Sequence, residues 1–554
     1  MQLIKKKESI NDKLIYLSIF STLFFVLISA LILNYGHLHE DAYILYIYSE
    51  NLAKTGVVNY YSEGPPAEGA TDFLWMVLIA AFNFSGVPSG IASAVLNAVG
   101  VFFVTLVIAK CATKENTNWT VVLFIVVFVP ISNIGQAAFM GFSTAFYSSL
   151  IAVMMYIGVF GKGRCILLIP VLGLALALVR PDGVIIGGLT TILFYLAIER
   201  KLRFSYLVVT LGCAIVGAAY FIWRWNYFGE ILPLPLIVKS SSDTSLPGLG
   251  INLKWLTLMM PLLVLAIYSP FILTKKRKQI LAVSIPILTY LILLTFAVQS
   301  QNVGHRFQAP VLVLILFLGA ISTSRINIST SLNFMHGQSP LKSVVLISLI
   351  FGVGALSLYN VRKTVILAGD SIKGNYIDVF PHYLSNYLND TSRIALTEAG
   401  RLAYWTPGMK YDLVGLNTAE TAVNGASIEY LTHLDADLIM MHQANMLSGI
   451  GCEDEQIFCR IDSNKFTTAF NSGGASSALS VEDRVRKAAS VTAKFLVDNF
   501  EDYAVYAVRY GSNYSHIYAI RLSGTLDTDD FEFALRRSFD PTVRLSYLGI
   551  IADR

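Results

Sequence analysis

The feature that most constrains this chain is a series of apolar blocks, each about 15 to 22 residues long, that fills its first 360 residues. A block of this length spans the hydrocarbon core of a bilayer as a helix. Only 14% of the 554 residues are charged, against about 25% in soluble proteins. The chain is therefore predicted to be a polytopic α-helical membrane protein with about eleven transmembrane helices. These spans are expected at 14–34, 88–109, 119–135, 141–160, 166–179, 183–198, 204–223, 255–273, 280–298, 308–323 and 343–360.

Clusters of Lys and Arg between the apolar blocks predict the orientation of the spans, because cytoplasmic loops are rich in these residues. The strongest basic loop is "TKKRKQ" at 274–279, and "ERKLR" at 199–203 and "GKGR" at 161–164 agree with it. With these loops inside, the N-terminus is cytoplasmic and the apolar segment 71–86 cannot cross the bilayer completely. That segment is expected to lie in the interface or to be re-entrant, and the last span leaves the membrane near Asn360.

Residues 361–554 are predicted to form a second domain outside the membrane, in the periplasm or its equivalent, after a membrane domain at 1–360. The stretches "YAVYAVRY" and "HIYAIRL" alternate as strands do, and the region has the pattern of a soluble α/β domain. Cys452 and Cys459 bracket the short polar stretch "CEDEQIFC". In an oxidising compartment this spacing predicts a disulfide bond, and two unpaired thiols are the alternative.

Two adjacent acids, Glu40 and Asp41, follow the first apolar block, near the start of the outer loop 35–70. Ionisable groups near the bilayer are expensive to place and tend to be functional. A carboxylate there could act as a general base that takes a proton from an acceptor hydroxyl. Tyr43 and Glu68 belong to the same loop and are candidate substrate contacts, since tyrosine rings suit sugar faces. The alternative is a loop of solvated acids without a function.

Cationic side chains occur on the same outer face, near the ends of the apolar blocks. Arginine and lysine in this position could hold the phosphate or pyrophosphate of a lipid-linked substrate. The alternatives are helix-end cations that extend to the interface, and cations that contact lipid headgroups. The candidate substrate-binding residues on these grounds are Arg180, Arg224, Lys239, His305 and Arg306.

Several function classes lack their motifs in this sequence. There is no Walker A motif, and "FGVGAL" at 351–356 lies inside an apolar block, so it is not a dinucleotide fingerprint. No His, Cys or Asp cluster has the spacing of a zinc site, and no basic domain indicates a nucleic acid partner. No metal or other cofactor is therefore predicted, although a divalent ion that bridges carboxylates and phosphate stays open.

The stretch "HEDAYILYIYSENLAKTGVVNYYSEGPPAEGATDFLW" resembles the first outer loop of a group of bacterial GT-C glycosyltransferases, to which the mycobacterial terminal arabinofuranosyltransferases belong. The pattern of that group contains Asp-Asp-Ala-Tyr, a later Gly, and Glu-Gly-Tyr-Thr-x-Phe-Leu-Trp. Further similar elements follow in the order of the group, and the resemblance runs from about residue 39 to residue 417. They are "RPDG" at 180–183, "YFGEILPLPLIVKS" at 227–240, "HRFQAP" at 305–310 and "YDLVGLN" at 411–417.

The resemblance implies a GT-C fold and the transfer of a sugar, with inversion, from a polyprenyl-phosphate donor to a cell-envelope glycan or glycolipid. The reaction would take place on the outer face of a bacterial inner membrane, with an acidic residue of the first loop as the base. Two positions depart from the group. Its first Asp is Glu40 here, so either Glu40 or Asp41 is the base, and the Glu of its Gly-Leu-Glu-Thr element is Ser143.

Two other functions remain as alternatives. A flippase or transporter of lipid-linked glycans would carry charged residues inside the spans, near the midplane, and the spans here are almost free of charge. A non-catalytic membrane sensor or scaffold, with an outer domain that binds a ligand, would not need the acid pair.

Overall fold

The computed structural model describes most of the chain, and all structural statements below refer to that part. For residues 34, 239, 340–350, 370–373, 511, 514, 545–546 and 549–550 it describes the backbone alone. The described residues are 9–34, 38–114, 119–239, 246–267, 276–299, 301–323, 340–373, 375–442, 447, 450, 452, 456–475, 483–511, 514–540, 545–546 and 549–550.

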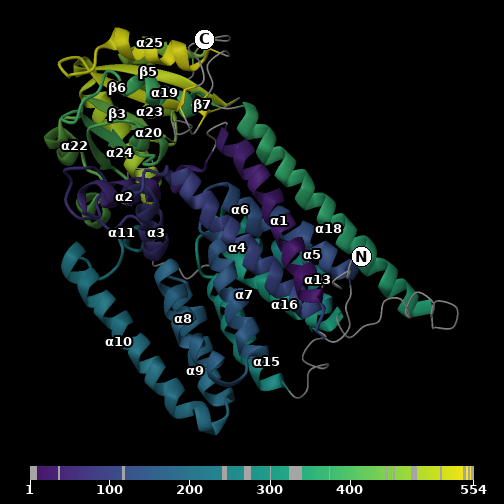
Figure 1. Cartoon of the computed structure of the whole chain (residues 1–554). Helices are drawn as coiled ribbons and strands as arrows, with labels where there is room; N and C mark the ends of the chain where they lie inside the picture. The colour runs from purple at the N-terminus through teal and green to yellow at the C-terminus, as the bar shows by residue number, and fades with distance from the viewer. Residues whose placement is uncertain are drawn as a thin grey trace, which may run out of the picture.

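Helices make up the first two-thirds of the chain (Figure 1). In the described part, five helical segments are long and apolar enough to cross a membrane, or six if one bent pair is a single span. Helices form at the expected positions, but the predicted number of about eleven spans is not confirmed. The elements are α1 (Ile10–Asn34), α2 (Glu40–Thr55), α3 (Phe73–Phe84), α4 (Ser89–Ala112), α5 (Trp119–Ile131), α6 (Asn133–Phe139), α7 (Thr144–Phe160), η1 (Gly163–Leu167), α8 (Leu168–Val179), α9 (Gly183–Ala197), η2 (Arg200–Leu202), α10 (Arg203–Phe228), α11 (Leu234–Lys239), α12 (Leu249–Leu258), α13 (Met260–Ile267), α15 (Arg277–Leu293), η4 (Val303–Gln308), α16 (Ala309–Thr323) and α18 (Pro340–Lys373).

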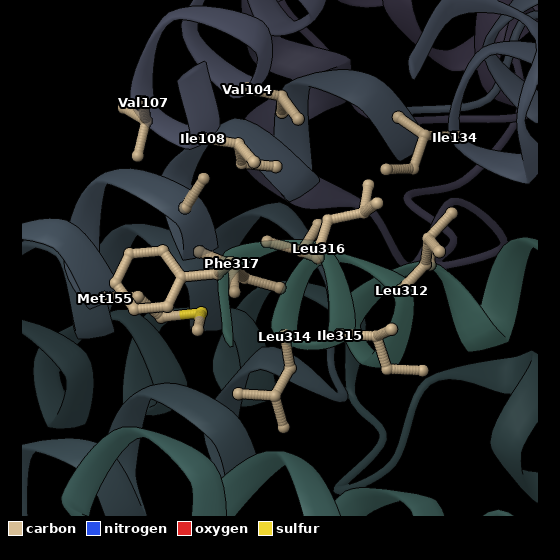
Figure 2. Packing of buried hydrophobic residues seen from close by; sticks show 14 of the residues in the cluster. Val104, Val107, Ile108, Ile134, Met155, Leu312, Leu314, Ile315, Leu316 and Phe317 are labelled. Atoms are coloured by element: carbon tan, nitrogen blue, oxygen red, sulfur yellow. The ribbon is translucent and has the colours of Figure 1, made fainter. Parts of the chain in front are cut away.

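The helix α16 lies at the centre of the bundle, and every one of its 15 residues is buried. Its Leu312 and Phe317 belong to one apolar cluster with Val104 and Ile108 of α4 and with Met155 of α7 (Figure 2). A helix that is apolar on all sides is stable only when other elements surround it. The short 3₁₀ helix η4 leads directly into α16, so the residues of η4 are anchored to the core of the bundle.

The helix α10 is the opposite case, since it lies at the edge of the bundle beside α8 (Figure 1) and only 6% of its most apolar window is buried. Its exposed side chains are large and apolar, for example Leu211, Ile215 and Phe221. A stretch of this length and composition is expected to face lipid. Its last turns carry one buried charged residue, Arg224, which is described with the site below.

One predicted span is wrong in its geometry. Of the segment expected as a single helix at 255–273, the structure describes residues 255–267, which belong to two helices, α12 and α13, that meet at an angle of 80°. Pro261 is the second residue of α13, and a proline both lacks an N–H donor and disfavours helical geometry in the residue before it. The bend therefore has a local cause that hydropathy alone does not show.

The apolar segment 71–86 forms α3, a helix of 12 residues. At about 1.5 Å per residue this helix is about 18 Å long, and the hydrocarbon core is about 30 Å thick. The length agrees with the prediction that this segment does not cross completely. The helix α3 packs against α2 and α4 at one end of the bundle.

The C-terminal part is built on a mixed sheet with the strand order β2-β1-β3-β6-β5-β4. The strand β1 pairs in parallel with β2 and β3, and the pairs β3–β6, β6–β5 and β5–β4 are antiparallel. The two strands expected from alternation are β5 and β6. The elements are α19 (Tyr376–Leu384), β1 (Arg393–Leu396), α20 (Arg401–Trp405), β2 (Met409–Asp412), α21 (Ala419–Asn424), α22 (Ile428–Leu434), β3 (Leu438–Met441), β4 (Phe458–Arg460), α23 (Ser463–Ser472), α24 (Arg484–Asp498), η8 (Phe500–Asp502), β5 (Tyr503–Gly511), β6 (Tyr514–Arg521), α25 (Thr528–Ser538), β7 (Leu545–Ser546) and β8 (Gly549–Ile550).

The expected domain boundary at 360/361 falls inside the helix α18, which continues to Lys373. Charged residues such as Arg362 and Lys363 do not end this helix, because a helix that leaves an apolar environment can continue in water. The sheet domain therefore begins after Lys373. It lies over the end of the bundle at which α2 and α3 are found (Figure 1).

The helix α2 and the loop after it lie between the bundle and the sheet domain. One apolar cluster combines Tyr48 and Tyr60 of this loop region and Met76 of α3 with Leu396 and Tyr518 of the sheet. The Tyr60 hydroxyl also donates a hydrogen bond of 2.5 Å to the carbonyl oxygen of Ala399. The position of α2 and of the loop after it thus depends on the sheet domain as well as on the helices.

Candidate active site

The acid pair occupies the first turn of α2. His39 is the N-cap residue of this helix, and its Nδ1 accepts a hydrogen bond of 3.2 Å from the backbone N–H of Asp41. Acidic side chains are favoured in the first turn because the N-terminus of a helix carries a partial positive charge. The backbone N–H of His39 donates to the carbonyl oxygen of Met140, which ties this turn to the bundle.

The sheet domain holds the carboxylate of Glu40. Its Oε1 accepts hydrogen bonds from the backbone N–H groups of Gly400 (2.6 Å) and Arg401 (2.7 Å), and its Oε2 lies 3.7 Å from Nε of Arg401. A side chain at position 400 is excluded, since a Cβ atom there would be 2.4 Å from Oε1 of Glu40. Burial and the neighbouring charge of Glu398 raise the pKa of Glu40 to about 8. The carboxylate of Glu40 is therefore fully engaged within the protein.

Asp41 has a different environment. Its Oδ2 lies 3.2 Å from Nη2 of Arg306, and its side chain is 23% exposed. The guanidinium of Arg306 also stacks over the ring of Phe142, with 3.8 Å between the guanidinium carbon and the ring centroid. Arg306 belongs to η4, where Gly304 and His305 both have positive φ angles and turn the chain sharply before α16. The sequence predicted Asp41 and Arg306 as separate candidates, and the fold joins them.

A second ion pair lies beside the first. The Nε and Nη2 atoms of Arg180 donate to the two carboxylate oxygens of Asp182, at 2.9 and 3.2 Å, while the guanidinium lies over the rings of Tyr147 and Phe307. The tight "RPDG" turn thus supplies both charges. The predicted cation Arg180 is part of the site, and Asp182 was not among the predicted residues.

The buried carboxylate of Asp72, which precedes α3, accepts a hydrogen bond of 2.8 Å from the hydroxyl of Ser143. Burial raises its pKa, while the charges of Arg180 and Arg306 act in the opposite direction. We call Asp41, Asp72, Arg180, Asp182 and Arg306 the charged cluster. It contains three carboxylates and two guanidinium groups, at the end of the bundle that faces the sheet domain.

Glu68 and Arg224 pair with each other instead of joining this cluster. Nε of Arg224 donates to both carboxylate oxygens of Glu68 (2.7 and 2.6 Å), and Nη1 donates to the carbonyl oxygen of Ile231 (2.6 Å). Their side chains are only 8% and 5% exposed. In the described part, no hydrogen bond or ion pair connects this pair to Asp41. The pair fastens the end of α10 to the first outer loop.

We predict that Glu68→Gln destabilises the protein, because it leaves a buried guanidinium without its counter-charge. Removal of one partner of a buried ion pair costs about 3 to 5 kcal/mol. In detergent, the melting temperature of the full-length protein should fall by about 5 °C. The matched control is Glu199→Gln, since Glu199 pairs with Lys201 on the surface and its removal should leave the melting temperature unchanged. An unchanged melting temperature in Glu68→Gln would contradict the assigned role of this pair.

Two other predicted residues, Tyr43 and His305, have their contacts away from the charged cluster. Tyr43 is 1% exposed and packs against the rings of Tyr404 and Trp405, so its ring is part of the core. His305 accepts a hydrogen bond through its backbone carbonyl from Asn133 (2.9 Å) and serves the turn before α16. Lys239 ends α11, and its side chain lies outside the described part of the structure.

Cys452 and Cys459 are joined by a disulfide bond, at the position that their spacing predicts. Cys459 lies on β4, at the edge of the sheet, and Cys452 lies in the segment before this strand. The bond therefore closes the loop that leads into the edge strand, far along the chain from the acid pair.

Comparison with known proteins gives a family match over part of the chain and a similar fold. Residues 373–517 match a family described as a domain of unknown function, DUF8728. No curated protein matches the chain. Among solved structures, ArnT from Cupriavidus metallidurans in the apo state is 12% identical, with a TM-score of 0.53, over 78% of this chain and 93% of ArnT. The same enzyme bound to undecaprenyl phosphate is 11% identical, with a TM-score of 0.54, over 92% of this chain and 98% of ArnT.

This chain therefore has the fold of the GT-C membrane glycosyltransferases, as the resemblance of its outer loop implied. With its apolar helices, it is a multi-pass membrane protein.

Proposed function

We propose that this protein transfers a sugar from a polyprenyl-phosphate donor to a cell-envelope glycan or glycolipid, on the outer face of a bacterial inner membrane. The observation that carries the proposal is the contact between Asp41 and Arg306. It combines a partly exposed carboxylate with a guanidinium at the end of the apolar bundle, within a GT-C fold. Transfer from a lipid-linked phosphosugar needs both groups at the end of the bundle. The carboxylate activates the acceptor hydroxyl, and the guanidinium binds the phosphate.

Asp41 is the proposed general base, and Glu40 is a positioning residue. Glu40 is held by two backbone N–H groups of the sheet domain and its side chain is 15% exposed, so these contacts compete with an acceptor hydroxyl for its carboxyl oxygens. Asp41 is partly exposed and keeps Oδ1 outside its contact with Arg306. This difference in exposure and contacts supports Asp41 as the acid that takes the proton.

The reaction is a single displacement. Asp41 takes the proton of the acceptor hydroxyl, and the hydroxyl oxygen attacks the anomeric carbon of the donor. The bond between that carbon and the phosphate oxygen breaks, and polyprenyl phosphate leaves with the electron pair. The guanidinium of Arg306, with that of Arg180 beside it, neutralises the developing charge on the phosphate. Attack opposite the leaving group inverts the anomeric carbon, and no nucleotide is needed.

Asp72 accounts for the departure at Ser143. The related group has a glutamate at that position, and here Ser143 donates a hydrogen bond to the Asp72 carboxylate. We propose that Asp72, at the N-cap position of α3, supplies the second carboxylate of the site. In this proposal the carboxylate comes from Asp72 instead of from position 143, and the number of negative charges in the site is the same.

An apolar groove between α1 and α4 is the proposed place for the prenyl chain of the donor. It has a volume of about 880 Å³, and its lining runs from Ile19 and Phe103 to Leu33 and Ile91. The end with Leu33 and Ile91 lies close to α2, because the hydroxyl of Tyr46 bonds Ser93 in the first turns of α4 (2.7 Å). The solved ArnT complex contains undecaprenyl phosphate, a ligand of this chemical type.

A polar and aromatic cleft of about 440 Å³ is the proposed acceptor site. Glu50, Lys54, Tyr404 and Trp405 take part in its lining, so both α2 and the sheet domain contribute. Aromatic rings with neighbouring hydrogen-bonding groups suit the faces and hydroxyls of sugars. Glu50 lies on the same helix as Asp41, nine residues further along the chain.

The test is a transfer assay with the full-length protein in detergent. A panel of radiolabelled polyprenyl-phosphate sugars is offered together with crude envelope acceptor, and label in the acceptor fraction is measured. We expect transfer from at least one donor without added nucleotide, and release of polyprenyl phosphate in equal amount. Correctly folded protein that transfers from no donor of the panel would overturn the proposal.

A further inference from the structure

Three metal-ligating side chains of the sheet domain are brought to one edge of the sheet by its topology. Glu398 follows β1 and His442 follows β3, and these two strands are parallel neighbours, so their carboxyl ends meet. His516 lies on β6, which is antiparallel to β3, and the pairing of Met441 with Ile517 places it opposite the end of β3. Residues 44 and 74 positions apart in the chain thus become neighbours.

The ligand atoms of the three side chains lie at the separations that a metal ion requires. Nδ1 of His442 is 3.4 Å from Oε2 of Glu398 and 3.4 Å from Nε2 of His516. Nε2 of His516 is 3.9 Å from the same Oε2. In a tetrahedral zinc site with bonds of about 2.0 to 2.1 Å, neighbouring ligand atoms are about 3.3 Å apart. The three atoms form one face of such a tetrahedron with a small adjustment of Glu398.

A hydrogen bond behind His516 holds its ring in the orientation that a ligand needs. Its Nδ1 lies 2.6 Å from the hydroxyl of Tyr376, and that hydroxyl lies 3.2 Å from the hydroxyl of Tyr518. If Nδ1–H donates to Tyr376, the lone pair of the ring is on Nε2, which faces Glu398 and His442. Histidines that bind metals usually have such a partner on the other ring nitrogen.

The local charge also favours a cation. Arg401 is the positive group beside Glu398, and it pairs with Asp378 (3.3 Å) and Glu40 (3.7 Å). Three carboxyl groups thus surround one guanidinium and offset its positive charge. The side chains of Glu398 and His442 are 22% and 26% exposed, so an ion can reach them from solvent, while His516 is fully buried.

We propose that Glu398, His442 and His516 form a binding site for a divalent transition-metal ion, with zinc as the best match. Two imidazole nitrogens and one carboxylate oxygen are a ligand set typical of zinc sites that keep a fourth position open. The ion would connect β1, β3 and β6 next to Gly400 and Arg401, which hold Glu40. The proposal rests on these three side chains and does not depend on the proposed transfer reaction.

The test uses the full-length protein in detergent, without a histidine tag and stripped with EDTA. It is titrated with zinc, passed over a desalting column, and analysed for bound metal by mass spectrometry. We expect about one zinc per chain and a rise in melting temperature of about 2 °C at saturating zinc. His442→Gln and Glu398→Gln should each weaken zinc binding more than tenfold, and Tyr376→Phe should weaken it by about 10- to 100-fold.

The matched control is His433→Gln, which removes an exposed histidine of the same domain and should leave zinc binding unchanged. Wild-type protein that retains no zinc would overturn the proposal, and this measurement does not depend on how any variant folds. Zinc binding that is equal in wild type, His442→Gln and Glu398→Gln would also overturn it, since the ion would then be bound elsewhere. The test measures bound zinc and melting temperature, and it does not measure sugar transfer. A failure of the transfer assay would therefore not contradict the zinc site.

Discussion

Asp41→Asn is expected to lower the rate of sugar transfer by about 10³-fold, because an amide cannot take the proton of the acceptor hydroxyl and general-base catalysis contributes about 10²- to 10⁴-fold. The loss should appear in kcat, with a smaller change in the KM of the donor. Initial rates with the active donor of the panel, compared at matched concentrations of folded protein, measure it. The melting temperature of the variant checks that the change in rate does not come from unfolding.

Two further variants decide whether the effect belongs to Asp41 itself. Glu40→Gln should retain more activity than Asp41→Asn, because Glu40 acts through the position of α2 and not on the acceptor. Glu501→Gln removes an exposed acid of the sheet domain and should leave the rate unchanged. A variant Asp41→Asn with full activity, or a larger loss in Glu40→Gln, would assign the base elsewhere.

Arg306→Ala is expected to lower kcat/KM for the donor by about 10²- to 10³-fold, the range found when one group that stabilises a developing negative charge is removed. The guanidinium would no longer neutralise the phosphate of the leaving group. Arg306→Lys should fall between wild type and Arg306→Ala, because it keeps the charge but loses the planar fork that binds phosphate oxygens. The measurement is the dependence of initial rate on donor concentration for each variant.

Arg536→Gln is the matched control for these variants. Arg536 lies on α25 with its side chain 67% exposed, and its removal takes away the same charge far along the chain from the cluster. Donor kinetics should be those of wild type. If Arg306→Ala also had wild-type donor kinetics, the phosphate would have to be held by another cation, and Arg180 would be the next to test.

Much of the helical architecture could be predicted from the sequence, because the length of an apolar run directly limits what it can span. The disulfide bond between Cys452 and Cys459 could also be predicted, because the two residues are only 7 positions apart in the sequence. Local chemistry that hydropathy does not measure was missed. Pro261 lies at the bend in one predicted span, and α18 continues beyond the predicted end of the last span at residue 360.

The partners of the site residues could not be predicted in the same way. Glu40 is held by Arg401, which is 361 positions away, and Asp41 pairs with Arg306, which is 265 positions away. Such contacts depend on how helices and sheet pack, and a single sequence carries no local signal for them. The same holds for the proposed metal ligands Glu398, His442 and His516. The order of the strands in the sheet brings them together, and their spacing in the sequence does not indicate it.

The hydrogen bonds from Gly400 and Arg401 to Glu40 have a consequence for the way proteins of this architecture can be recombined. The outer loop depends on the sheet domain for the position of its first acid, and Gly400 cannot be replaced without a clash. A chimera that exchanges only the sheet domain would keep these backbone donors only if the new domain placed its chain at the same position beside Glu40. Acceptor specificity should therefore be transferable between such enzymes only when α2 and the sheet domain are exchanged as one module.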